Sequence, residues 1–171
     1  MTESVIIDKS LSEEEIYQSL LPQIESLLNP DEPLISNLSN VTAALKEPFE
    51  KISWVGFYFL KGNQLFLGPF QGKIACTIIE IGKGVCGTSA AKKETIIVED
   101  VEKFSGHIAC DSGSRSEIVV PLIKDNKLYG VLDLDSFQLS AFSFRDKQYL
   151  EKLCKLLSDK LEIEKITSIT S

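Results

Sequence analysis

The sequence predicts an α+β domain in which a central, mostly antiparallel sheet is flanked by N- and C-terminal helices. Apolar residues recur at helical spacing near both ends of the chain, and short β-branched and aromatic runs alternate with turn signals between them. A hydrophobic fraction of 43% and a charged fraction of 25% are ordinary for a globular protein. We therefore expect a single domain over residues 1–171, with an N-terminal helical segment (1–48), a sheet with its loops (51–142) and a C-terminal helix (143–164).

The N-terminal helical segment begins at a capping box. Ser12 and Glu15 have the spacing at which a hydroxyl and a carboxylate satisfy each other's exposed backbone donors. Pro22 predicts a bend in this first helix. Residues 29–33, which contain two prolines, interrupt the pattern, and a second helix is expected to run to Glu47.

The middle of the chain is read as strands separated by turns. Runs typical of strands cover residues 52–60, 65–70, 75–81, 95–98, 117–123 and 128–135. Tight turns are predicted at 61–64 and 124–127, and the small-residue segment 82–93 predicts a short helix. The last helix is expected to begin at Ser143, with Asp146 completing a variant capping box.

Charge and hydropathy exclude several classes of partner. The chain has 18 basic and 25 acidic residues and a net charge of −7, which argues against nucleic-acid binding. The N-terminus has no signal-peptide pattern, and no run approaches the roughly 18 apolar residues of a membrane span. We expect a cytoplasmic protein with no nucleic-acid or membrane partner.

The four cysteines are too few for a disulfide-built scaffold, so each is considered as a thiol. Cys154 lies on the apolar stripe of the last helix and is expected in the core. Cys76 lies near a strand start, Cys86 at a glycine-bracketed helix start and Cys110 in a polar loop. A helix N-terminus would favour a Cys86 thiolate, whereas the loop after Cys110, with Arg115, could bind an anion. Redox and metal chemistry both remain open on these residues alone.

A zinc site would have to draw on Cys76, Cys86, His107 and Cys110. Only His107 and Cys110 have the close pairing usual in zinc sites, and no C-x-x-C motif occurs. We therefore expect no metal. His107 could instead serve as a base for Cys110, although a loop histidine often has no such role.

Two predicted strands carry unusual side chains on one face. Trp54, Gly56 and Tyr58 share a face because side chains alternate along a strand, and the glycine would leave a notch for an apolar group such as a thioether. Asp133 and Asp135 also share a face, roughly 7 Å apart. Two carboxylates there need a cation, either a substrate ammonium or a metal. Core packing of the aromatics and a solvated acidic face are the alternatives.

Glu117 opens the strand that is predicted to pair with the Asp133–Asp135 strand. It could therefore lie close to the two aspartates. Clustered carboxylates raise one another's pKa, so a protonated general acid near neutral pH is expected at Glu117.

Several motifs together resemble the free methionine-(R)-sulfoxide reductases, enzymes built on a GAF domain. They are WVGFY (54–58), LGPFQG (67–72), GVCG (84–87), HIACD (107–111), SRSEIVVPL (114–122) and LDLDS (132–136). The resemblance implies a GAF-like domain with a small enclosed pocket, the R epimer of free methionine sulfoxide as substrate and thioredoxin as electron donor. It also implies a homodimer, and it implies no resident cofactor.

The resemblance also assigns roles to residues. It implies that Cys110 is the catalytic cysteine, that Cys76 is the resolving cysteine and that Cys86 is a third, which could instead be the nucleophile. Glu117 would protonate or hydrogen-bond the sulfoxide oxygen, and a Cys110 sulfenic acid would condense with Cys76 to a disulfide. The remaining contacts would be Trp54 and Tyr58 to the methyl end, Asp133 and Asp135 to the ammonium or sulfoxide, and backbone amides near Ser116 to the carboxylate.

Two other functions are compatible with parts of the sequence. A GAF-type sensor would bind a small ligand without turnover, but it has no need of a nucleophile with resolving partners. A zinc-dependent hydrolase would require a bound metal.

Overall fold

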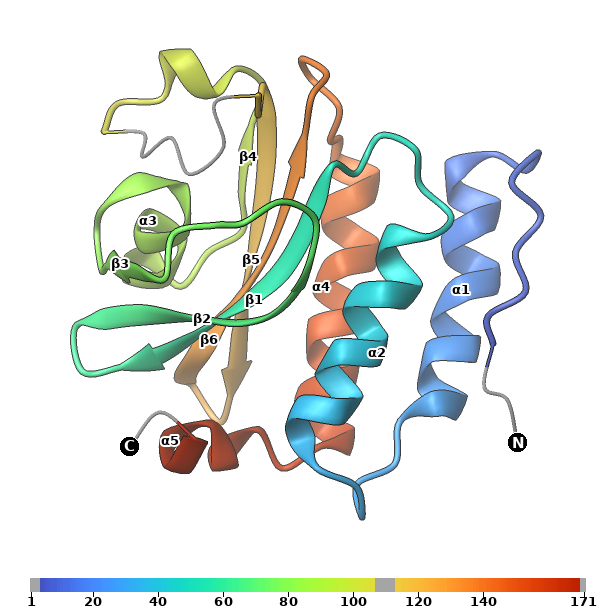
Figure 1. Cartoon of the computed structure of the whole chain (residues 1–171), viewed down its shortest axis with the longest axis horizontal. Coiled ribbons are helices and arrows are strands. Elements are labelled where there is room, and N and C mark those ends of the chain that lie inside the picture. Colours follow the sequence, from blue (N-terminus) through green and yellow to red (C-terminus); the bar gives the residue numbers. More distant parts are fainter. Residues whose placement is uncertain (1–3, 107–112, 170–171) are drawn as a thin grey trace.

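The computed structural model describes residues 4–106 and 113–169. In this part of the chain, six strands form one antiparallel sheet in the order β3-β2-β1-β6-β5-β4, with helices on both faces (Figure 1). The strands are β1 Trp54–Lys61, β2 Gln64–Gln71, β3 Ile78–Glu80, β4 Ile96–Val98, β5 Ser116–Lys124 and β6 Lys127–Ser136. The helices are α1 Glu13–Leu27, α2 Leu34–Lys46, α3 Gly84–Lys92, α4 Phe144–Lys160 and α5 Ile166–Ile169, with 3₁₀ turns at Val101–Lys103 and Ile163–Lys165.

Both predicted capping boxes are present. The Ser12 and Ser143 hydroxyls accept from backbone N–H groups of the first turn, while the carboxylates of Glu15 and Asp146 accept from the N-cap N–H groups. Helix α1 continues through Pro22, which lies inside its bounds.

The predicted strand over residues 75–81 is wrong in its first half, because β3 covers only Ile78–Glu80. Residues 72–77 instead form an irregular crossing segment between β2 and β3. Two of its carbonyls accept hydrogen bonds from side chains of β1 rather than from a neighbouring strand: Lys73 O from Trp54 Nε1 and Cys76 O from Tyr58 Oη. Side-chain donors thus replace the strand ladder here.

The C-terminal helix is also shorter than the predicted 143–164. Helix α4 ends at Lys160, and Leu161 adopts an extended conformation with φ −110° and ψ 156°. The chain then turns so that Ile163 and Ile166 are fully buried against the main core. Burial of these two side chains therefore competes successfully with continuation of the helix.

The two faces of the sheet differ in kind. Helices α1, α2 and α4 cover one face, and the large apolar core lies between them and the sheet (Figure 1). The opposite face carries α3 and a smaller apolar cluster that includes Trp54, Tyr58 and Cys86. No helix of the described residues has the length and apolar character needed to cross a membrane.

A buried ionic network links two of the helices that pack on the large apolar core. Asp146 at the start of α4 is 1% exposed, and its Oδ1 accepts from Tyr17 Oη at 2.8 Å and from Lys51 Nζ at 2.8 Å. Lys51 Nζ also pairs with Glu13 at 2.7 Å. The network joins α1, α4 and the segment that leads into β1.

Candidate active site

Strand register brings the predicted acidic and aromatic residues onto one face of the sheet. Glu117 lies opposite Asp135 across β5 and β6, and Asp135 lies opposite Trp54 across β6 and β1. In the adjacent row, Asp133 lies opposite Gly56. Directly opposite residues of an antiparallel pair share a face, so all these side chains lie on the α3 side.

A compact polar cluster lies between this face and α3. Cys86 Sγ donates to Glu117 Oε1 at 3.9 Å. The Cys86 sulfur and one carboxylate oxygen each of Glu117 and Asp133 all lie within 4.8 Å of one another. Cys86 is 3% exposed, and Glu117 and Asp133 are each 6% exposed. Within the described residues, Asp133 Oδ1 is buried without a hydrogen-bond partner. A buried carboxylate oxygen of this kind calls for a donor or a cation from a ligand.

Burial and mutual repulsion raise the pKa of both acids. The pKa of Glu117 lies well above its ordinary value because of desolvation, then because of the charges of Asp133 and Asp135. Desolvation and Asp135 also raise the pKa of Asp133, but hydrogen bonds from Cys86 and Glu117 oppose that rise. Burial and the acidic neighbours therefore favour a proton held between Glu117 and Asp133. This is the direction that the sequence predicted for Glu117.

Cys86 lies in the first turn of α3, as the sequence predicted, but a low thiol pKa does not follow. Desolvation, followed by the charges of Asp133 and Glu117, raises the pKa of Cys86 well above its ordinary value. A helix dipole contributes only about 0.3–2 kcal/mol, which burial beside two carboxyl groups outweighs. Cys86 is thus a neutral hydrogen-bond donor in this arrangement, which weighs against it as the nucleophile.

The notch predicted at Gly56 is filled by the neighbouring indole. A Cβ at Gly56 would lie 2.9 Å from Trp54 Cζ3 and 2.6 Å from Phe70 Cβ. At the pyrrole end of the same indole, a Cβ at Gly72 would lie 2.5 Å from Trp54 Cδ1. The two glycines leave room for the indole, which is 5% exposed.

The indole belongs to a wall of three stacked rings. The Trp54 ring lies 5.4 Å from the Phe70 centroid and 6.0 Å from the Tyr58 centroid, at interplanar angles of 18° and 28°. We call Trp54, Tyr58 and Phe70 the aromatic wall. The sequence reasoning missed Phe70, whose place follows from its register opposite Gly56.

Two serine side chains, at and just before the start of β5, form hydrogen bonds close to the acidic residues. Ser114 Oγ donates to Asp135 Oδ1 at 2.6 Å, a contact that sequence reasoning missed. The Ser116 hydroxyl instead donates to Gln138 O at 2.6 Å and accepts from Ala141 N at 3.2 Å. Ser116 therefore anchors the chain after β6 with its side chain, which leaves only its backbone for the predicted carboxylate contact.

The structure distributes the cysteines as follows. Cys76 is half-buried in the crossing segment, and Cys154 is buried in α4 on the opposite side of the sheet, as predicted. Cys110 and His107 lie outside the described residues, and so does part of the zinc set considered from the sequence. Within the described residues, the group able to share a metal ion is Cys86, Glu117 and Asp133, whose sulfur and oxygen donors suit zinc.

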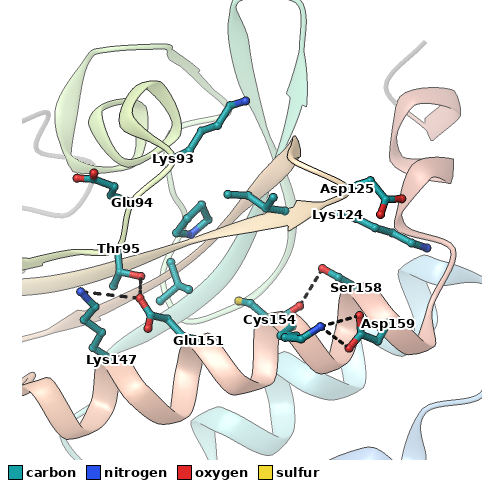
Figure 2. Close-up of a pocket in the computed structure, with 14 residues that line it drawn as sticks. Lys93, Glu94, Thr95, Lys124, Asp125, Lys147, Glu151, Cys154, Ser158 and Asp159 are labelled. Atoms are coloured by element: carbon teal, nitrogen blue, oxygen red, sulfur yellow. Dashed lines mark hydrogen bonds and ion pairs between the residues drawn. The ribbon is translucent and has the colours of Figure 1, made fainter.

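A concave region on the other side of the sheet contains none of the predicted site residues (Figure 2). This groove of about 660 Å³ runs between α4 and the end of β5. Two ion pairs lie within its lining, Lys155 with Asp159 at 2.8 Å and Lys147 with Glu151 at 3.9 Å. Among the described residues, the predicted acidic and aromatic site residues and Cys86 therefore gather on the α3 face.

Comparison with known proteins gives a consistent picture. The GAF domain profile matches residues 12–161. GAF domain-containing protein A of Dictyostelium discoideum is 54% identical over 160 residues, covering 93% of this chain and 100% of that protein. Free methionine-R-sulfoxide reductase of Saccharomyces cerevisiae is 46% identical over 157 residues, covering 87% of each chain.

A solved structure extends the similarity to the whole fold. Free methionine-R-sulfoxide reductase from Neisseria meningitidis, in complex with its substrate, superposes with a TM-score of 0.89 at 42% identity, covering 99% of this chain and 100% of that one. The match spans the helices, the sheet and the acidic face together. The chain therefore has the GAF fold and belongs to the free methionine-R-sulfoxide reductase family of GAF domain proteins.

Proposed function

We propose that this protein reduces free L-methionine-R-sulfoxide to methionine, with thioredoxin as the external reductant and no resident cofactor. The observation that carries this proposal is a buried Glu117, whose pKa is raised, beside Asp133 and the aromatic wall. It is supported by 46% identity to the yeast reductase and by the fold shared with the Neisseria reductase–substrate complex.

The site offers a complementary group for each part of the substrate. The unpartnered Asp133 Oδ1 suits a substrate ammonium, and Trp54 and Tyr58 suit the S-methyl end. Asp135, held by Ser114, borders both. A methionine within a peptide chain lacks the free ammonium and would leave Asp133 Oδ1 without a partner in a buried position, so peptides should be rejected.

Glu117 supplies the proton in the proposed chemistry. Hydrogen bonding or proton transfer from Glu117 to the sulfoxide oxygen makes the sulfur electrophilic, and the Cys110 thiolate attacks it. The sulfoxide oxygen leaves the substrate sulfur and ends as the hydroxyl on the Cys110 sulfur, the transient bond between the two sulfurs breaks, methionine leaves, and Cys110 is a sulfenic acid. Cys86 donates to Glu117 and so helps to orient the acid.

The oxidised enzyme is then returned to its thiol form. Cys76 attacks the Cys110 sulfenic acid, a disulfide forms, and the displaced hydroxide leaves as water with the thiol proton. A thioredoxin dithiol reduces that disulfide by exchange. Cysteines that are kept reduced between turnovers fit the cytoplasm, which we propose as the compartment. We also propose that the protein is a homodimer.

A thioredoxin-coupled assay tests the proposal with the free R sulfoxide, the free S sulfoxide and a peptide sulfoxide. Turnover of the free R form alone supports it. Equal activity on the peptide, or binding of the R form without turnover as in a GAF-type sensor, refutes it.

Cysteine variants test the assigned roles in a single turnover. Cys110→Ser should form no methionine, whereas Cys76→Ser should still release about one methionine per enzyme. Cys154→Ser is the matched control, since Cys154 is buried on the other side of the sheet and should turn over normally. Loss of single turnover in Cys86→Ser, with Cys110→Ser active, would make Cys86 the nucleophile.

A further inference from the structure

We propose that the polar cluster of Cys86, Glu117 and Asp133 is a binding site for Zn²⁺ or another thiophilic divalent cation, and that an ion bound there excludes the sulfoxide substrate. The metal site is inferred from the geometry of the cluster alone. The exclusion of substrate rests on the proposed function and deepens it, because it adds an inhibitor to the same pocket. The ion binds reversibly and takes no part in the reaction.

Three possible metal ligands meet from three different elements. The Cys86 sulfur comes from the first turn of α3, the Glu117 carboxylate from β5 and the Asp133 carboxylate from β6. One atom of each lies within 4.8 Å of the others, and Cys86 Sγ is 3.9 Å from Glu117 Oε1. Zinc bonds of about 2.3 Å to sulfur and about 2.0–2.2 Å to oxygen place tetrahedral sulfur and oxygen ligands roughly 3.6 Å apart. Side-chain rotation can supply the remaining contraction, so the cluster can close around an ion without backbone movement.

A free carboxylate oxygen and the surrounding acids both favour a cation in the cluster. Asp133 is 6% exposed, and its Oδ1 is buried without a hydrogen-bond partner. The neighbours that act on the pKa values of Asp133 and Glu117 are each other, Cys86 and Asp135, and all of these groups are acids. A divalent cation would therefore satisfy the free oxygen and neutralise the carboxylates at the same time.

The Cys86 sulfur determines which cations fit the cluster. A substrate ammonium needs no sulfur ligand, and the proposed reaction uses Cys86 only as a neutral donor to Glu117. Thiolate ligands select Zn²⁺ and similar cations over Mg²⁺ and Ca²⁺, which prefer oxygen. When the ion binds, a sulfur–metal bond replaces the sulfur–hydrogen bond of Cys86, and the proton leaves to solvent. The N-terminal end of α3 stabilises the thiolate that is formed.

The backbone around the cluster holds the three ligands in place. Gly82 N donates to Gly87 O at 2.8 Å, and Gly87 N donates to Lys83 O at 3.0 Å, so the first turn of α3 is hydrogen-bonded to the loop before it. Gly87 also lies against Glu80 O, with which a Cβ at this position would collide. The two carboxylates are supported by the pairing of β5 with β6 along their length. Ligands that are held in advance make binding less costly, because little has to be ordered when the ion arrives.

An ion in this position competes with the proposed substrate contacts. Glu117 is the acid proposed for the sulfoxide oxygen, and Asp133 Oδ1 is the acceptor proposed for the ammonium. The ion would occupy both carboxylates, and its two positive charges would repel an ammonium at close range. As a metal ligand, Glu117 would also have no proton to donate. Metal binding and sulfoxide binding should therefore exclude each other.

Cobalt spectroscopy tests the metal site without turnover. The full chain carries Cys76→Ser and Cys110→Ser, because the two redox thiols could bind metal themselves. Co²⁺ should give a thiolate-to-cobalt charge-transfer band, which Zn²⁺ but not Mg²⁺ should remove by displacement. Adding Cys86→Ser should abolish the band and weaken Zn²⁺ binding by more than about 100-fold, since loss of an outer-shell partner alone costs about 10–100-fold. Adding Cys154→Ser should change neither; it is the matched control, because Cys154 is also 3% exposed but belongs to no metal-binding group of the described residues.

The cobalt band decides whether the metal site exists. A band that is absent, or that survives Cys86→Ser, overturns it. Should Cys86→Ser fail to fold, Asp133→Asn is measured instead. That variant keeps the thiolate and its band but should weaken Co²⁺ binding by at least about tenfold, and an unchanged affinity overturns the site.

Titration of the Co²⁺ complex with free R sulfoxide tests the exclusion of substrate. The band should fall with the R sulfoxide and persist with the S sulfoxide. Equal loss with both epimers, which means chelation by the amino acid in solution, or a band that persists at R sulfoxide concentrations that saturate the metal-free wild type, overturns the exclusion. If the metal-free wild type does not turn over the R sulfoxide, the proposed function is refuted, and the cobalt band alone then decides the metal site.

Discussion

Glu117→Gln should make the protein more stable while it removes activity. In the native state Glu117 is 6% exposed, and desolvation and the neighbouring aspartates raise its pKa above the ordinary value of 4.5. In the unfolded chain the same carboxyl ionises freely above about pH 4.5. Keeping the proton in the native state therefore lowers the free energy of unfolding as the pH rises above that value, until the native pKa is reached.

The pH of the assay sets an upper limit on this loss of unfolding free energy. Each pH unit above the ordinary pKa contributes about 1.4 kcal/mol, so at pH 7 the penalty is at most about 3.4 kcal/mol. Glutamine carries no ionisable proton, and its amide can still donate to Asp133, so the penalty disappears in the variant. A gain of about 1–3 kcal/mol at pH 7 remains after allowing for imperfect packing, or roughly 2–12 °C in Tm.

Urea unfolding of both proteins from about pH 5.5 to about pH 7.5 measures this directly. The stability gain of Glu117→Gln should grow with pH, by at most about 2.7 kcal/mol over that interval. Glu80→Gln, at an exposed position on β3, is the control and should change stability by less than about 0.5 kcal/mol throughout. Turnover in the coupled assay should fall about 10²–10⁴-fold in Glu117→Gln. A gain that does not change with pH, or a loss of stability at pH 7, would refute the assignment of a retained proton.

Three further predictions follow from the packing and the charges. Gly56→Ala places a Cβ against the Trp54 indole. We therefore expect urea unfolding to show about 1–3 kcal/mol of destabilisation, and the KM for the sulfoxide to rise. An unchanged KM would contradict the role of the aromatic wall in substrate binding. Asp146→Asn should destabilise by about 3–5 kcal/mol because it leaves Lys51 poorly paired at 9% exposure, whereas Asp159→Asn, in an exposed pair, should change stability by less than about 1 kcal/mol. Burial alone would raise the pKa of Asp146, but bonds from Lys51, Ser143 and Tyr17 hold it below 3.8, so its contribution is present above that pH and is lost as the pH falls through the lowered pKa. Dialysis against a metal chelator should leave turnover unchanged, and activity restored only by zinc would show that the polar cluster holds a catalytic metal.

The sequence predicted local structure best where local chemistry decides it. The two capping boxes need only residues three positions apart, and the β5–β6 hairpin needs only alternation and a turn, so both are present where expected. The terminal helix was predicted too long because its end is set by burial of Ile163 and Ile166 against distant residues. The first half of the strand predicted over residues 75–81 is wrong for a similar reason, since a side chain of β1 supplies a hydrogen bond to its backbone.

The candidate site shows the same division. Alternation along single strands correctly grouped Trp54 with Tyr58 and Asp133 with Asp135 on their faces. It could not show that the indole fills the space over Gly56, because that depends on a side-chain conformation and on Phe70 in another strand. The Ser114–Asp135 bond likewise joins two elements that are not adjacent in the chain.

By itself the sequence determined the class of fold, the acidic and aromatic faces and the resemblance to a reductase family, because periodicity and motif order are properties of the chain. Only the tertiary structure decided which pKa values are raised. Cys86 has the sequence position of an activated thiol, yet packing of α3 against Glu117 and Asp133 buries all three and raises the pKa of each. Desolvation depends on what covers a group in space, and residues 31 positions apart supply that cover here.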